Sequence, residues 1–446
     1  MRWHRWAEVS ACVALVVAPA SQGAEPGYEI SVGVGQSDNV YLTSANRKSD
    51  TLFTQGVDFT WHDQRPSLTA DIDANLSYLE FLNHTFNNQL LGNFLGDARF
   101  TLAPVLFWDI SDNFGQGRVN PLAQATPGNQ ENINYLSTGP ELKLPLGGDT
   151  LLDVQTHYAH VSYQVSPLNS NRFSGQVGIL HQLSANSGVS VNVRDERVDY
   201  ANLVANQDYS RQDAFGRLDA KGVRTTLAID LGVSRLRGIQ SPTTGLLARV
   251  EASRRISASS VLALMIARQY SDAADSFRLG QTLSGANVVA PQGVTASGTP
   301  FTSDLASLAW NFQKQRTGFG LEASYNKDSY HTLFPSQDDK RIALMGHVTR
   351  QLTPTLSVTL QDQYQHETFI DAAGFFTENN TDLIVAWRMA RRLTLTFDYN
   401  HDIRHSDLPG TAYTDNRAWV LIGYGRPAQI PPGPATPPLP STSRLY

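Results

Sequence analysis

The amino-acid sequence predicts an all-β fold, a closed antiparallel transmembrane β-barrel of about 20 strands (roughly 16–22) wound as an up-and-down meander. Three observations predict it. Long runs of residues alternate between apolar and polar side chains, and the connections between these runs alternate between short and long. After the N-terminal leader, no stretch approaches the ~20 consecutive apolar residues that a membrane-spanning helix needs.

The alternating runs carry most of this prediction. In the segment 393–404, LTLTFDYNHDIR, Leu395 and Phe397 share one parity, whereas Asp398 and Asp402 share the other. A period of two indicates a strand with one apolar and one polar face. The runs are ~9–13 residues long, which fits a tilted membrane strand of ~9–11 residues better than a soluble strand of ~5–6. Comparable runs cover 53–62, 68–78, 226–234, 319–326 and 382–389.

The connections point the same way. The short ones lie at 64–67, 146–149, 184–187, 221–224, 317–318 and 353–355, and the long ones lie at 37–50, 82–90, 117–130, 276–302 and 369–377. Outer-membrane barrels have short periplasmic turns and longer extracellular loops. An even number of strands would place both termini in the periplasm.

The apolar faces must meet lipid if this prediction is right. About twenty strands with one apolar face each would need an equally large second apolar layer in water, and nothing in the chain supplies one. Lipid can supply it, and closure of the sheet removes the unpaired edges that hydrocarbon does not tolerate. Aromatic residues near the ends of the runs fit two interfacial girdles, with Trp108 and Trp310 on the short-turn side and Tyr78 and Tyr399 on the other.

The N-terminus has the pattern of a secretory signal. Residues 1–24 contain a positive start and an apolar stretch followed by small residues, and we expect cleavage between 20 and 24. Cys12 lies in VSAC, which is similar to a lipoprotein cleavage box, but the apolar stretch follows Cys12 and favours an ordinary signal peptide. The mature chain then has no thiol and no disulfide. The barrel is expected over 25–426.

The C-terminal segment 427–446 is rich in proline and cannot join a sheet. We expect it to be disordered and polyproline-like in the periplasm, with docking to a periplasmic partner as the alternative. The last run, 417–425, is expected to be recognised by the barrel-assembly machinery. Outer-membrane lipid is the main expected partner. Nucleic acid is not expected, because the net charge is −6 and no basic block occurs.

Charged side chains on the polar parity should line the lumen. Two interpretations fit them: a selective conduit for a hydrophilic solute, or pairs that brace the wall across strands. The candidate lumen-lining residues are Asp58, Asp71, Asp73, Arg194, Asp230, Arg249, Glu251, Arg255, Glu322, Arg388, Asp398, Asp402 and Arg404.

Two long loops are candidates to fill the lumen. Loop 276–302 is rich in small residues and poor in charge, and it would either fold inward and constrict the pore or remain outside; we expect an external loop. Loop 117–130 is rich in Asn, Gly and Pro, whose turns bond their own backbone. We expect it to be ordered, as a rim or as an inward fold.

We expect no catalytic, cofactor-binding or metal-binding residues, and no enzyme. His401, Asp402, His405 and Ser406 are close in the sequence, but proximity in sequence is not the geometry of a catalytic triad. Four other histidines are scattered over different runs without the spacing of metal ligands; they are His62, His157, His160 and His181.

One segment resembles a known family. The stretch 107–142, FWDISDNFGQGRVNPLAQATPGNQENINYLSTGPEL, is similar to a stretch of the PEP-CTERM-system-associated outer-membrane proteins, and SDNVYL at 37–42 is similar to their early strands. The resemblance implies an outer-membrane barrel of a Gram-negative envelope, linked to exopolysaccharide or exosortase systems, without an established activity. The matching residues are Asn113, Phe114, Gly115, Gln116, Asn120, Pro121, Pro127, Asn129, Asn132, Asn134, Gly139 and Pro140.

The sequence thus favours a channel or export conduit for a hydrophilic solute, such as a polysaccharide, associated with exopolysaccharide export. The alternative is a plugged structural or docking barrel without transport activity.

Overall fold

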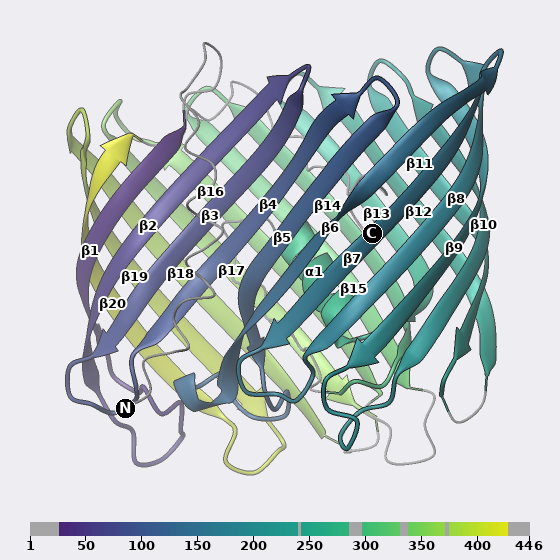
Figure 1. Ribbon diagram of the computed structural model, residues 1–446. Coiled ribbons are helices and arrows are strands. Elements are labelled where there is room, and N and C mark those ends of the chain that lie inside the picture. Colours follow the sequence, from purple (N-terminus) through teal and green to yellow (C-terminus); the bar gives the residue numbers. More distant parts are fainter. Residues whose placement is uncertain (1–25, 240–241, 285–296, 331–337, 371–373, 427–446) are drawn as a thin grey trace.

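The computed structural model describes residues 26–239, 242–284, 297–330, 338–370 and 374–426. Twenty antiparallel strands form a single sheet in which each strand pairs with its neighbours in sequence, and β1 pairs with β20 to close the barrel (Figure 1). The predicted closed, 20-stranded, up-and-down barrel is confirmed. The predicted signal peptide at 1–24 and the proline-rich tail at 427–446 lie outside the described residues.

The strands tilt across the barrel in Figure 1 and run between 11 and 18 residues, long enough to cross a membrane at that tilt. They are β1 (Gly27–Ser37), β2 (Asp50–Arg65), β3 (Leu68–Phe81), β4 (Gln89–Ala103), β5 (Leu106–Arg118), β6 (Gln130–Gly147), β7 (Thr150–Tyr163), β8 (Ser170–Ser184), β9 (Ser187–Tyr200), β10 (Tyr209–Lys221), β11 (Thr225–Arg237), β12 (Thr243–Ser257), β13 (Ser260–Ser271), β14 (Phe301–Lys314), β15 (Thr317–Tyr330), β16 (Asp339–Gln351), β17 (Leu356–Phe369), β18 (Gly374–Ala390), β19 (Leu393–Ser406) and β20 (Tyr413–Arg426).

The connections alternate as the sequence predicted. At one end of the barrel, strands are joined by short turns such as 66–67 and 391–392, and at the other end by longer segments such as 38–49 and 272–300. Gly27, the first residue of β1, pairs with Thr60, close to the turn at 66–67. Arg426, the last residue of β20, pairs with Tyr28 of β1. Both ends of the barrel sheet therefore lie at the short-turn end.

The outer wall is apolar and the side chains facing the lumen are polar. Val191 and Leu231 are 71% and 60% exposed on the outer face. Trp108 and Trp310 stand on that face towards the short-turn ends of β5 and β14, whereas Tyr399 lies midway along β19. Carboxylates, amides and arginines occupy the alternate positions and point inward. A closed sheet with an apolar outside satisfies every ladder hydrogen bond within the wall, so lipid can surround it without meeting unpaired backbone groups.

The α-helix α1 (Ala273–Ser284) follows β13 and lies inside the barrel (Figure 1). Among the described residues, no helix is long and apolar enough to cross a membrane. The pairing of β13 with β12 stops at Arg268, whereas its pairing with β14 continues to Ser271. The end of β13 is therefore free of β12, and the chain turns into the lumen there.

The apolar side of α1 packs on the inner face of β6 and β7. Phe277 is completely buried in a cluster with Ala274 of the helix and with Ile133, Tyr135 and Val161 of the barrel wall. Asp272 caps the helix by accepting a hydrogen bond from the backbone N–H of Asp275 at 2.9 Å. The expectation that loop 276–302 stays outside is therefore wrong for the residues described; 285–296 lie outside the described ranges.

Candidate functional site

Buried ion pairs fix α1 to the barrel wall. Asp275 of the helix lies 3.0 Å from Nη1 of Arg211 on β10 and 3.4 Å from Nη1 of Arg172 on β8. Asp272, just before the helix, pairs with Arg172 and accepts a hydrogen bond from Tyr209 at 2.7 Å. All of these groups are buried, so the contacts are shielded from solvent.

This anchor cluster is electrically neutral. It contains four arginines and four carboxylates: Arg172, Arg194, Arg211, Arg278, Glu196, Asp213, Asp272 and Asp275. A buried charge is tolerated when it is paired and hydrogen-bonded, and removing one partner is strongly destabilising. The cluster therefore acts as a structural clamp that holds α1 in one position.

Electrostatics favour the ionised form of the helix carboxylate. Burial alone would raise the pKa of Asp275, but the charges of Arg211, Arg172 and Arg278 outweigh burial and hold the pKa well below its ordinary value of 3.8. Arg278 also stacks over Tyr135, with its guanidinium carbon 4.7 Å from the ring centroid. At neutral pH the Asp275 carboxylate is therefore ionised.

The loop between β5 and β6 also folds over the lumen. Arg404 on β19 donates hydrogen bonds to the carbonyl oxygens of Leu122 and Ala123 at 2.8 and 3.1 Å. Gln124 donates to the carbonyl of Leu42 in the loop after β1 at 3.0 Å. The loop contains the short 3₁₀ turn η2 (Pro127–Asn129). The prediction that 117–130 is ordered is confirmed, and its contacts across the barrel make it an inward fold.

A cavity of about 490 Å³ remains beneath this loop, between β1–β5 and β17–β20. Amide side chains form much of its wall; they are Gln89, Gln116, Gln130, Gln361, Gln363, Gln365, Asn380 and Asn400. Four carboxylates also line it, namely Glu378, Asp382, Asp398 and Asp402. We call this space the acidic cavity.

The cations in the wall of the acidic cavity are already paired. Arg118 lies 2.7 Å from Glu378, and Arg417 lies 2.5 Å from Asp415. One oxygen of Asp398 is buried without a hydrogen-bond partner among the described residues. Because buried carboxylate oxygens are normally satisfied, this one is suited to a cationic or hydroxyl group of a solute.

The predicted lumen residues fall into separate groups. Asp398 and Asp402 line the acidic cavity, and Arg404 lies beside it, 3.0 Å from Glu378. Arg194 belongs to the anchor cluster.

The predicted residues of β11 and β12 brace the wall that leads away from the anchor cluster. Arg249 pairs with Glu251 on the same strand, and Asp230 lies 3.7 Å from Arg217. The bracing interpretation fits this group.

The remaining predicted residues lie elsewhere on the wall. Glu322 accepts a hydrogen bond from Ser307 at 3.2 Å. Arg255 and Arg388 are exposed near the short turns, next to irregularities in strand register. Asp58 accepts a hydrogen bond from Asn75 on β3.

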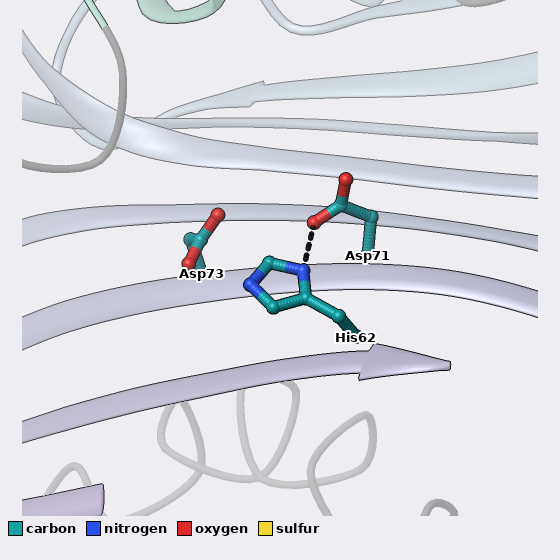
Figure 2. A group of neighbouring side chains, drawn as sticks. All are labelled: His62, Asp71 and Asp73. Atoms are coloured by element: carbon teal, nitrogen blue, oxygen red, sulfur yellow. Dashed lines mark hydrogen bonds and ion pairs between the residues drawn. The ribbon is translucent and has the colours of Figure 1, made fainter. Parts of the chain in front are cut away.

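Asp71 and Asp73 on β3 lie close to His62 on β2 (Figure 2). Nδ1 of His62 is 2.7 Å from Oδ1 of Asp71. Sequence reasoning placed His62 among histidines without ligand spacing and so missed this group. The signal was available, because a tight hairpin turn at 66–67 sets residues 62 and 71 opposite each other.

Other residues were missed for different reasons. Arg211 and Asp213 lie on the polar parity of β10 and could have been found by the alternation used for the other strands. Asp275 and Arg278 could not have been found in this way, because they lie on a helix that the sequence did not predict.

The residues weighed as catalytic make ordinary structural contacts. Nδ1 of His401 lies 2.7 Å from Oδ1 of Asn416, and the hydroxyl of Ser406 donates a hydrogen bond to the carbonyl oxygen of Phe375 at 3.0 Å.

Comparison with known proteins agrees with the barrel architecture. Residues 301–423 match the family described as "Putative beta-barrel porin 2". No curated protein matches the chain. The link to PEP-CTERM systems that the sequence resemblance implied is not confirmed by these comparisons.

Among solved structures, the FrpB iron transporter from Neisseria meningitidis is similar with a TM-score of 0.46 at 8% identity, covering 90% of this chain and 82% of that one. The copper transporter OprC gives 0.45 at 10% identity, covering 92% and 84%. OccK2 from Pseudomonas aeruginosa gives 0.36 at 10% identity, covering 90% and 98%. The closed sheet and apolar outer wall are those of an outer-membrane β-barrel.

Proposed function

We propose that this protein is an outer-membrane channel for small hydrophilic solutes, which admits cations and neutral polar molecules more readily than anions. The acidic cavity carries the proposal. Its wall combines amides with carboxylates, and the two arginines that line it are paired with acids. In this proposal the short-turn end, with Gly27 and Arg426, faces the periplasm.

The structure of the lumen supports a narrowed conduit. Alpha-helix α1 and the loop that follows β5 occupy part of the barrel interior, so the free path is much smaller than a 20-stranded wall alone would leave. Rings of side-chain charge and the free diameter together set selectivity in such pores. A solute that passes must be small or flexible and must tolerate a wall of amides and carboxylates.

A saccharide is the narrower form of this proposal. Amide and carboxylate groups hydrogen-bond to hydroxyls, and the resemblance of 107–142 to barrels of exopolysaccharide-linked systems favours a role in export of such a polymer. The inward fold of the loop at 119–129 limits this form, because a polymer would have to pass Arg404 and its bonds to that loop. Short, unbranched saccharides fit this constraint better than bulky ones.

Planar-bilayer recording of the purified full-length protein tests the proposal. We expect steady open-channel current in KCl, and swelling of proteoliposomes in solutions of neutral sugars. A bilayer that stays sealed at all voltages would contradict it.

The plugged barrel is the second candidate, and a specific observation favours it: the anchor cluster holds α1 by buried ion pairs, which is suited to a permanent plug. The same recordings separate the two candidates. A sealed wild-type protein that conducts after α1 is released would establish the plugged form.

A further inference from the structure

We propose that His62, Asp71 and Asp73 form a binding site for a divalent transition-metal ion, with Zn²⁺ the best match, at the short-turn mouth of the lumen. Each residue offers one ligand atom, and the three atoms lie within 4.8 Å of one another. This inference goes beyond the channel function and does not depend on it.

The β2–β3 ladder fixes the three residues relative to each other. His62 pairs directly with Asp71, and Thr60 pairs with Asp73, so all three side chains emerge on one face within two rungs of the ladder. The face is the lumen side, because His62 shares its parity with Leu52 and Thr54, which are buried in the interior. The backbone of a closed barrel leaves this spacing little freedom to change.

The hydrogen bond to Asp71 orients the imidazole for a metal. Nδ1 of His62 faces Oδ1 of Asp71 at 2.7 Å, and the other ring nitrogen, Nε2, lies on the side of Asp73 (Figure 2). Metal-binding histidines commonly hold one ring nitrogen against a carboxylate while the other binds the ion. Here Nε2 of His62 and the Asp73 carboxylate are the direct ligands, and the Asp71 carboxylate holds the imidazole in place through Nδ1.

The ligand types select the ion. Imidazole nitrogen with carboxylate oxygen suits Zn²⁺, Ni²⁺ and Cu²⁺, whereas Mg²⁺ and Ca²⁺ prefer oxygen alone. Ligand atoms around a tetrahedral zinc are about 3.4 Å apart, and rotation of the His62 and Asp73 side chains can bring Nε2 and a carboxylate oxygen to that separation. The site therefore leaves at least one position for water.

Charge and access also fit a cation. The charged residues that face the lumen from β1, β2 and β3 are, apart from His62, carboxylates, and they include Glu29 and Asp58 beside this group. The side chain of His62 is 60% exposed and that of Asp71 is 38% exposed. An ion in the lumen can therefore reach the group without any rearrangement of the wall.

Isothermal titration of the purified full-length barrel with Zn²⁺, in a buffer containing excess Mg²⁺, tests the site. We expect one equivalent to bind, and we expect His62→Ala and Asp73→Asn each to weaken binding about tenfold or more. The matched control is His347→Ala, which removes another lumen-facing histidine, packed against Gly320 on a different part of the wall, and should change affinity less than about twofold.

Asp73→Asn keeps the shape of the side chain, and heat-modifiable migration in gels shows that each variant is folded. Wild-type protein without stoichiometric Zn²⁺ binding would overturn the proposal, as would binding that both variants retain. Because titration needs no current through the pore, a failure here is distinct from a failure of the channel function.

Discussion

The wall formed by β8–β10 and the wall formed by β18–β20 both project charged side chains into the lumen, but they arrange them differently. On the first wall, Arg172 and Arg211 pair with Asp275 of α1, and the charges of the whole anchor cluster sum to zero. On the second wall, Asp382 and Asp398 face the acidic cavity of about 490 Å³, and one oxygen of Asp398 has no partner among the described residues. Paired charges hold the fold, whereas charges left facing the cavity are available to a solute.

The largest effect should come from breaking the anchor cluster on the wall formed by β8–β10. Asp275→Ala leaves Arg172, Arg211 and Arg278 with an uncompensated buried charge, which costs about 3–5 kcal/mol in comparable cases. We expect α1 to leave the wall and amide exchange of 273–284 to accelerate. Single-channel conductance should rise about several-fold, because the area that the helix occupied becomes part of the open path.

The control for this substitution is an ion pair on the outer face. Asp304→Ala removes the partner of Arg268, whose side chain is 52% exposed. Because this pair faces away from the lumen and does not contact α1, conductance should be unchanged. Equal effects of Asp275→Ala and Asp304→Ala would remove the distinction between a clamp and an ordinary surface pair.

The next effect concerns the acidic cavity. Replacing Asp382 and Asp398 together by Asn removes two unneutralised charges while keeping the volume of the side chains. We expect the potassium-to-chloride permeability ratio to fall about three-fold or more, measured by reversal potential in a KCl gradient.

A paired control on the other wall sharpens this prediction. The double substitution Arg249→Met and Glu251→Gln removes an ion pair whose charges sum to zero. Its permeability ratio should stay close to that of the wild type. If the paired substitution moved selectivity as much as the cavity substitution, the two walls would not differ in function.

Acid should release the clamp. The folded-state pKa of Asp275 lies below its ordinary value of 3.8, so its ionisation stabilises docking of α1 above that pH, and this contribution is lost as the pH falls towards the lower folded-state pKa. We expect conductance to increase between neutral pH and the region below 3.8. Asp275→Asn should conduct more at neutral pH and should respond less to acid; an identical acid response would show that other groups control the helix.

The smallest effect should come from the amides. Gln361→Leu with Gln363→Leu removes two hydrogen-bonding groups from the cavity wall without changing its charge. We expect proteoliposome swelling in neutral sugar to slow about two-fold, with little change in the permeability ratio for ions. Unchanged swelling would show that sugars do not contact this wall.

Sequence reasoning predicted the barrel because its signals are local. Alternation alone places Asp398 and Asp402 on the lumen side, and the turn after β2 fixes the register that brings His62 to Asp71. The helix α1 is different. Its sequence, AADSFRLGQTLS, has only a weak apolar stripe and contains a glycine. Its position depends on Arg172 and Arg211, which are distant in the chain, so no local pattern could reveal it.

Whether an acid-lined path stays open past α1 is tested most directly by the reversal potential of the wild-type protein across a KCl gradient. An open current whose reversal potential lies towards the potassium equilibrium potential is the predicted result. A reversal potential towards that of chloride, or a bilayer that never conducts, would contradict it.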